Sequence, residues 1–163
     1  MASPLELMKS NPLFKDFPND VLGLFIETGE TRPYNKGDVI FQEGSVSDEI
    51  YLILEGRVSV KYQLANASTP TDVIYLGPGE ILGEISFVES TPRSATVVAE
   101  APVKVRVWKS EHWRALCEQH PGIGYKLVLG IAKILCERLR RSSVHVALLN
   151  KIFWGGEQQK KPA

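Results

Sequence analysis

Cysteine is scarce in this chain, because only Cys117 and Cys136 occur among its 163 residues. Both fall in segments whose apolar spacing predicts helices, so neither a disulfide framework nor a zinc site with four cysteine ligands can be built from them. Such cysteine usage favours a reducing compartment, and we expect a cytoplasmic protein.

Long apolar runs are also missing. The first ten residues lack a basic region followed by an apolar run and a small-residue cleavage site, so no secretory signal is predicted. The longest apolar stretch, residues 123–136, is interrupted by Lys126 and Lys133 and is shorter than the roughly 20 residues that a membrane span needs. We therefore expect no membrane span.

The chain has no net charge, since 19 basic side chains balance 19 acidic ones. This balance argues against a protein that binds nucleic acid with its whole surface. The charges are unevenly distributed: residues 1–125 carry 11 basic and 17 acidic side chains, and residues 126–163 carry 8 and 2. An acidic body is thus followed by a basic C-terminal region.

Short apolar or alternating runs, separated by turn residues, occupy the chain between Thr31 and Lys109. They are residues 39–41, 50–54, 57–63, 71–76, 94–100 and 103–108. Strands this short, at spacings near ten residues, are typical of an antiparallel barrel or sandwich.

Helices are predicted on both sides of these strands. We expect N-terminal helices within residues 1–28, including one from Pro18 to Glu27. After the strands, Ser110 caps a helix that ends before Pro121, and apolar residues at steps of three and four predict a longer helix from Ile123 to Phe153. Residues 1–153 should form one domain, and residues 154–163 a flexible tail.

One segment between two predicted strands, residues 83–96, has the composition of a ligand-binding turn. A short helical turn here leaves backbone N–H groups without partners, which favours a bound anion. Gly83 allows close approach of a ligand, and Arg93 can offer a two-pronged cation to a phosphate. Glu84 would be repelled by that phosphate unless it faced a donor such as a sugar hydroxyl. Together these residues predict a nucleotide site.

This segment closely resembles the phosphate-binding cassette of cyclic nucleotide-binding domains. The resemblance extends over roughly residues 11–140. It is carried by GEIS at 83–86, PRSAT at 92–96, KGDVIF at 36–41, EG at 43–44, Asp48, YLILEG at 51–56 and LGPGE at 76–80.

The resemblance implies a mainly β fold, an antiparallel β-barrel of the double-stranded β-helix or jelly-roll type with N-terminal helices and C-terminal lid helices. It also implies that the Glu84 carboxylate takes the ribose 2'-hydroxyl and that Arg93 takes the cyclic phosphate. The other expected ligand contacts are Gly83, Ile85, Ser86, Ser94 and Ala95. Candidates to cover the base, by apolar contact or by an arginine stacked on the purine, are Ile134, Leu135, Arg138 and Arg141.

The expected ligand is a cyclic mononucleotide, with cAMP favoured and cGMP as the alternative, and no cofactor is expected. The Ser94 hydroxyl could touch the phosphate, reach the amino group of a syn guanine, or only complete a strand edge. An ion pair between Glu84 and Arg93 is the structural alternative to their binding roles.

Three other functions are alternatives to nucleotide binding. A metal-dependent barrel enzyme would need histidines on its strands, yet none occurs between Thr31 and Lys109, so we expect neither catalysis nor a metal site. A DNA-binding regulator would continue into a helix-turn-helix module, but only ten residues follow Phe153, so a chain complete as given would not bind DNA. The third is a ligand-independent domain that uses the long helix to form a homodimer or to bind an unidentified effector.

Overall fold

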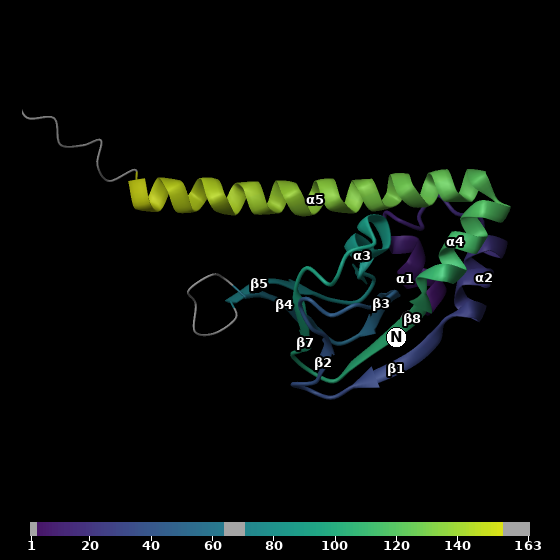
Figure 1. The fold of residues 1–163 in the computed structure, drawn as a ribbon, viewed down its shortest axis with the longest axis horizontal. Coiled ribbons are helices and arrows are strands. Elements are labelled where there is room, and N and C mark those ends of the chain that lie inside the picture. Colours follow the sequence, from purple (N-terminus) through teal and green to yellow (C-terminus); the bar gives the residue numbers. More distant parts are fainter. Residues whose placement is uncertain (1–2, 64–70, 155–163) are drawn as a thin grey trace, which may run out of the picture.

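A computed structural model of the chain describes residues 3–63 and 71–154 (Figure 1). Helix α1, Pro4–Ser10, begins with a capping box, because the Ser3 hydroxyl accepts a hydrogen bond from the Glu6 N–H while the Glu6 carboxylate accepts one from the Ser3 N–H. Helix α2 spans Asn19–Thr28, one residue later than predicted. The two helices turn Met8, Leu22 and Phe25 into the core.

Within the described residues, eight strands form two four-stranded antiparallel sheets. Their bounds are β1 Glu30–Tyr34, β2 Val39–Phe41, β3 Glu49–Glu55, β4 Val58–Tyr62, β5 Thr71–Leu76, β6 Ile81–Leu82, β7 Thr96–Ala99 and β8 Val103–Lys109. The first sheet has the order β1-β8-β3-β6 and the second β2-β7-β4-β5. Each pairing within them is antiparallel.

The prediction of a mainly β fold with flanking helices is confirmed, but a closed barrel is not found. Among the described strands, the hydrogen-bonded ladders stay within two separate sheets. Strand β1 was not predicted, because it is largely exposed and contains Pro33. It lies at the edge of its sheet, where a residue without a backbone N–H is tolerated.

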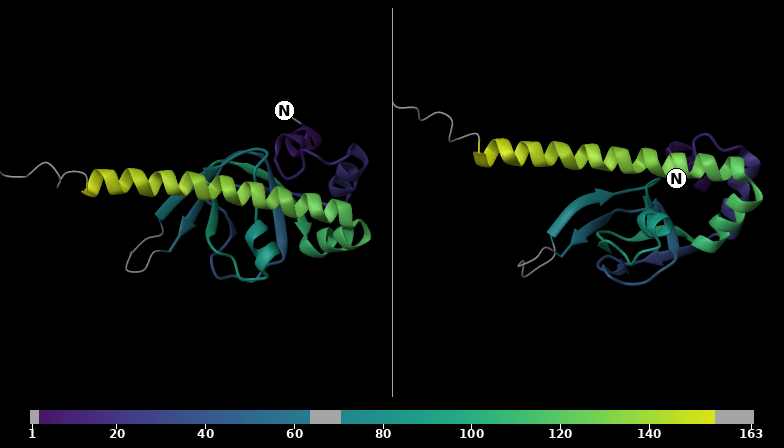
Figure 2. Two further views of the ribbon diagram at one scale, coloured as in Figure 1. Left: turned by 90° about the horizontal axis from the view of Figure 1, so that it is seen from above. Right: turned by 45° about the horizontal axis from the view of Figure 1, so that its top comes forward.

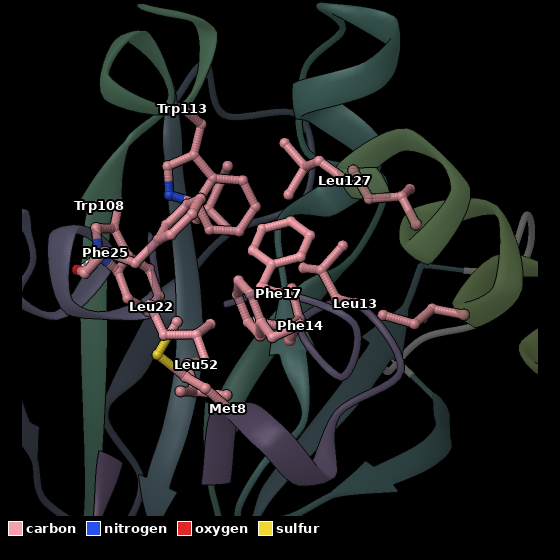
Figure 3. Close-up of a cluster of buried hydrophobic side chains, with 14 residues drawn as sticks. Met8, Leu13, Phe14, Phe17, Leu22, Phe25, Leu52, Trp108, Trp113 and Leu127 are labelled. Atoms are coloured by element: carbon pink, nitrogen blue, oxygen red, sulfur yellow. Dashed lines mark hydrogen bonds between the residues drawn. The ribbon is translucent and has the colours of Figure 1, made fainter. Parts of the chain in front are cut away.

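Strand β3 is buried on both faces and therefore connects two hydrophobic cores. Ile50 and Leu52 point toward the helices, where they join Phe14, Trp108 and other residues of one cluster (Figure 3). The alternate residues Tyr51 and Ile53 belong to a second cluster between the sheets. The period of two along a strand thus divides the interior into a helical core and a sheet core.

The described part of the chain contains three further helices: α3 Glu84–Glu89, α4 Ser110–Gln119 and α5 Pro121–Trp154. Helix α5 passes along the side of the molecule that carries α3 and extends beyond the strands (Figures 1 and 2). Its side chains Leu127, Ile131 and Ile134 are buried in the helical core. Trp154 ends the helix, and the rest of the predicted tail, residues 155–163, lies outside the described residues.

Cys117 and Cys136 are both free thiols, in α4 and α5. Among the described helices, none is both long and apolar enough to cross a membrane.

Gly130 sets how closely α5 approaches the segment between α1 and α2. A Cβ atom at position 130 would lie 2.6 Å from the Leu13 Cα atom and 2.9 Å from its carbonyl oxygen. We expect Gly130→Ala to lower the free energy of unfolding by roughly 1 to 3 kcal/mol, because backbone rather than a mobile side chain must move.

Gly23 in α2 is a matched control, since a Cβ there meets nothing within 4 Å. Gly23→Ala should raise the free energy of unfolding by up to about 1 kcal/mol, through helix propensity alone. Denaturant unfolding of both variants measures the contrast, and an equal gain from the two substitutions would contradict the close packing at Gly130.

Candidate functional site

A cavity of about 600 Å³ lies among the second sheet, α3 and α5. It is lined by all seven residues predicted from the cassette: Gly83, Glu84, Ile85, Ser86, Arg93, Ser94 and Ala95. From α5, three of the four candidates to cover the base, Leu135, Arg138 and Arg141, also line it. Ile134 does not line the cavity; it is buried in the helical core instead.

The turn into α3 requires a glycine at position 83. Gly83 precedes the first residue of α3 with φ at +84°, in the left-handed region that favours glycine. A Cβ atom there would lie 2.7 Å from the Glu49 carbonyl oxygen and would also collide with the Arg93 guanidinium. Gly83 thus lets the cassette pack directly against β3.

Arg93 is buried in the cavity wall, with only 3% of its surface exposed. Its Nη2 donates to the Ser47 hydroxyl at 2.9 Å and to the Glu49 carbonyl oxygen at 2.6 Å. The guanidinium carbon lies 4.3 Å from the centre of the Phe41 ring, which provides a cation–π contact. The Nε atom has no hydrogen-bond partner within the described part of the chain, so an N–H group in this wall remains to be satisfied.

The backbone of Arg93 is tied to the loop between β2 and β3. The Gly44 N–H donates to the Arg93 carbonyl oxygen at 2.8 Å, and the Arg93 N–H donates to the Ser45 carbonyl oxygen at 2.9 Å. Backbone and side chain of Arg93 are therefore held by one loop and the start of β3. The Arg93 cation is therefore fixed in the cavity wall by the protein itself, without the help of a ligand.

Glu84 is the second buried charge of the site, at 2% exposure. The guanidinium of Arg138 pairs with its Oε1, while the Nη2 of Arg138 donates to the Ile81 carbonyl oxygen at 2.7 Å. Burial raises the pKa of Glu84, whereas the charges of Arg138 and Arg93 act to lower it.

These contacts differ from the expected ones in two ways. Arg138 was a candidate to stack on the purine, but its guanidinium lies on the Glu84 carboxylate. The alternative ion pair between Glu84 and Arg93 is replaced by separate partners, because the side chain of Arg93 donates to Ser47 and Glu49. Sequence reasoning could not find the Arg138 contact, since the two residues are 54 positions apart.

The apolar wall of the cavity was not predicted. It is formed by Phe41, Val60, Tyr62, Ile74, Leu76, Leu82, Val97 and Leu139. The alternation of inward and outward positions along the predicted strands is the signal that could have indicated some of them. It does not tell a cavity-lining residue from one in the core.

Residues 31–120 match the family described as the cyclic nucleotide-binding domain, which is more than half of the chain. The chain belongs to this family. The cassette, with Glu84 and Arg93 in one cavity wall, lies within the matched residues.

Known relatives of this cyclic nucleotide-binding domain are longer proteins. The Cyclic AMP receptor protein of Thermus thermophilus is 29% identical over 143 residues, which cover 88% of this chain and 64% of that protein. A cyclic nucleotide-gated potassium channel of Mesorhizobium japonicum is 33% identical over 118 residues, which cover 72% of this chain and 31% of the channel. The human cGMP-dependent protein kinase 2 is 31% identical over 93 residues, covering 57% and 12%. The chain thus spans less than two thirds of these relatives.

Solved structures share the fold. A cyclic nucleotide-binding domain from Methylobacillus flagellatus has a TM-score of 0.79 at 27% identity, covering 88% of this chain and 80% of that one. The Thermus thermophilus Catabolite Activator Protein has a TM-score of 0.71 at 28% identity, covering 86% and 63%.

Glu49 supports the Arg93 side of the site and gives a testable dependence on pH. Its carboxylate accepts hydrogen bonds from Arg32 at 3.2 Å and from the Tyr51 hydroxyl at 2.6 Å. Burial alone would raise the pKa of Glu49, but these bonds and the charges of Arg32 and Lys109 lower it to about 2.

A carboxyl group with a lowered pKa stabilises the fold above its unfolded-state pKa and loses this contribution as the pH falls through the folded-state value. We expect the Tm of the wild type to fall as the pH is lowered from about 4.5 to 2, and the Tm of Glu49→Gln to fall less. The difference between the two proteins in the loss of unfolding free energy over this window should be roughly 2 kcal/mol. Thermal unfolding across this window measures the difference. Parallel curves would show that Glu49 is not held as described.

Proposed function

We propose that this domain is a sensor for a cyclic mononucleotide, with cAMP as the favoured ligand and cGMP as the alternative. The observation that carries the proposal is the pairing of a buried cation and a buried carboxylate, Arg93 and Glu84, in the wall of one cavity. The cavity volume, about 600 Å³, falls in the usual range for small-molecule sites.

The two charges match the chemistry of such a ligand. A 3',5'-cyclic phosphate carries one negative charge and leaves the 2'-hydroxyl as the only free ribose hydroxyl. Arg93 would take the phosphate, using the Nε–H that has no partner among the described residues. Glu84 would accept the hydroxyl. Because both side chains are buried, these contacts form away from bulk water, where charge-assisted hydrogen bonds are strong.

The preference for adenine over guanine as the base is argued from the cavity lining and from the relatives. The apolar wall, including Val60, Ile74 and Leu76, suits either purine. The relative with cyclic AMP in its name matches 88% of this chain, whereas the cGMP-dependent kinase matches 57%, and this favours cAMP. Ser94, which lines the cavity, is the residue that would favour cGMP by reaching the guanine amino group.

Helix α5 is proposed to relay binding. Leu135, Arg138 and Arg141 line the cavity, while Leu127 and Ile131 on the same helix pack in the helical core. A ligand that contacts α5 therefore biases the position of an element that also belongs to the core.

A second candidate function is a ligand-independent interaction domain. Exposed apolar side chains along α5 favour it: Tyr125, Val128, Leu129 and Leu139. The partner would be a second copy of this chain or an unidentified effector. Such a domain would show no stabilisation by any cyclic nucleotide.

We further propose that this chain binds its ligand without catalysis and without a cofactor, and that it works in the cytoplasm. Neither histidine nor cysteine lines the cavity in the part of the chain that the structure describes, so the residues there suit recognition rather than acid–base or nucleophilic chemistry. The two free thiols suit a reducing compartment.

The test is a panel of cAMP, cGMP, a cyclic dinucleotide and 5'-AMP, measured by thermal shift and calorimetry. At about 100 times its dissociation constant, cAMP should raise the free energy of unfolding by roughly 2.7 kcal/mol. Arg93→Lys should weaken binding by roughly 2 to 5 kcal/mol, because Lys cannot reproduce the guanidinium contacts.

The exposed Arg57 lies outside the cavity, so Arg57→Lys should bind like the wild type. Tight binding by Arg93→Lys would contradict the phosphate role. No response to any nucleotide would favour the interaction domain.

The relay is tested by hydrogen exchange on the full chain. Addition of cAMP should change the protection of backbone amides in residues 131–143, because these residues include the cavity-lining part of α5. Unchanged exchange there, at saturating ligand, would leave α5 as a structural element only.

A further inference from the structure

The cation directly paired with Glu84 comes from α5 rather than from the cassette. Glu84 lies at the start of α3 and is 2% exposed, and the Arg138 guanidinium binds its Oε1. A buried carboxylate without a partner is strongly unfavourable, so this contact stabilises the ionised form of Glu84 in the cavity wall.

Arg138 is itself held in place. Its Nη2 donates to the carbonyl oxygen of Ile81 in β6 at 2.7 Å, and its side chain is 24% exposed. The guanidinium therefore joins β6 to α3 through two different nitrogens. Such a two-point contact fixes the direction of the cation, which a single exposed ion pair does not.

The other charges near Glu84 have different partners. Arg93, which follows α3, acts on Glu84 through its charge, but its side-chain hydrogen bonds go to the Ser47 hydroxyl and to the carbonyl oxygens of Glu49 and Gly83. Arg141, one turn beyond Arg138, lines the same cavity and pairs with Glu137. Among the described residues, Arg138 is thus the cation that holds Glu84.

We propose that Arg138 is a positioning residue for ribose recognition: its guanidinium orients the Glu84 carboxylate and keeps it charged, so that Glu84 can accept the 2'-hydroxyl of the nucleotide. This inference rests on the proposed function of the site and names the residue on which its ribose selectivity depends. It assigns to α5 a part in reading the sugar, beyond covering the base.

The chemistry of the carboxylate supports this role. An ionised carboxylate offers about four acceptor positions, so pairing with Arg138 leaves room for a hydroxyl. A protonated carboxyl group is a weaker acceptor and turns one oxygen into a donor. Burial raises the pKa of Glu84, and Arg138 is the largest opposing influence. Without Arg138, the carboxylate would lose both its direction and part of its charge.

The experiment measures the affinity of the full chain for cAMP and for 2'-deoxy-cAMP by calorimetry. We expect the wild type to prefer cAMP by about 10- to 100-fold, the range for a hydrogen bond to a charged group. Arg138→Gln should lose most of this preference while its affinity for 2'-deoxy-cAMP changes little. Arg138→Lys, which keeps the charge, should retain part of it.

Two further comparisons separate this role from a purely structural one. In a Glu84→Gln background, Arg138→Gln should cause no further loss of preference, because the two residues act on the same hydroxyl. Lowering the pH protonates Glu84 and reduces the preference. This reduction should occur at a higher pH in Arg138→Gln than in the wild type, because the pKa of Glu84 is then less opposed.

Arg140→Gln is the matched control, since Arg140 is exposed on the same helix and does not line the cavity. It should keep the wild-type preference. If Arg138→Gln is too unstable to bind, Arg138→Lys and the double variant with Glu84→Gln still decide the question. The double variant should unfold at a higher temperature than Arg138→Gln, because it lacks the unpaired buried charge.

The outcomes distinguish this inference from the proposed function. If the wild type binds neither nucleotide, the proposed function is wrong and the inference falls with it. If the wild type prefers cAMP and Arg138→Gln keeps that preference, only the inference is wrong. An equal loss of affinity for both nucleotides would likewise overturn it, since it would show that Arg138 acts on the base or on packing.

Discussion

The burial of two opposite charges in one cavity wall is the constraint on which the rest of the site depends. Arg93 and Glu84 are each at most 3% exposed, so each needs polar partners to offset the loss of water. Those partners come from different parts of the chain. Ser47 and the Glu49 carbonyl group hold Arg93, and Arg138 holds Glu84. The start of β3, the cassette and α5 must therefore lie close together for both charges to have their partners.

Helix α5 serves two environments along its length. Near its start, Leu127 and Ile131 are packed in the helical core, and Gly130 lets the helix approach Leu13 closely. Two turns later, Leu135 and Arg138 line the cavity. Because one rigid helix makes both contacts, its packing against the N-terminal segment places Arg138 within reach of Glu84. Stability of the core and geometry of the site are therefore linked through α5.

Much of the fold and of the cassette could be predicted from local pattern. Six of the strands between residues 39 and 108 and the two C-terminal helices follow from apolar period and turn residues, and they occur within a few residues of their expected places. Strand β6, Ile81–Leu82, was not predicted, because two residues are too few to show an apolar period. Strand β1 was missed because its edge position leaves it without a clear apolar pattern. The closed barrel was an expectation from resemblance, and the strands described pair as two sheets instead. Whether strands join into a closed barrel depends on hydrogen bonds between strands distant in the sequence, which no local pattern specifies.

Gly83, Glu84 and Arg93 of the cassette could be identified from the amino-acid sequence alone, because their chemistry and spacing are local. Their surroundings depend on contacts between distant parts of the chain, which become visible in the folded structure. In the structure, Ile134 lies in the core rather than in the cavity. Arg138, expected over the base, contacts the Glu84 carboxylate instead. A helix of 34 residues presents several faces, and its rotation is set by packing at Leu127, Gly130 and Ile131, which precede the cavity-lining residues Leu135 and Arg138 by about one to three turns.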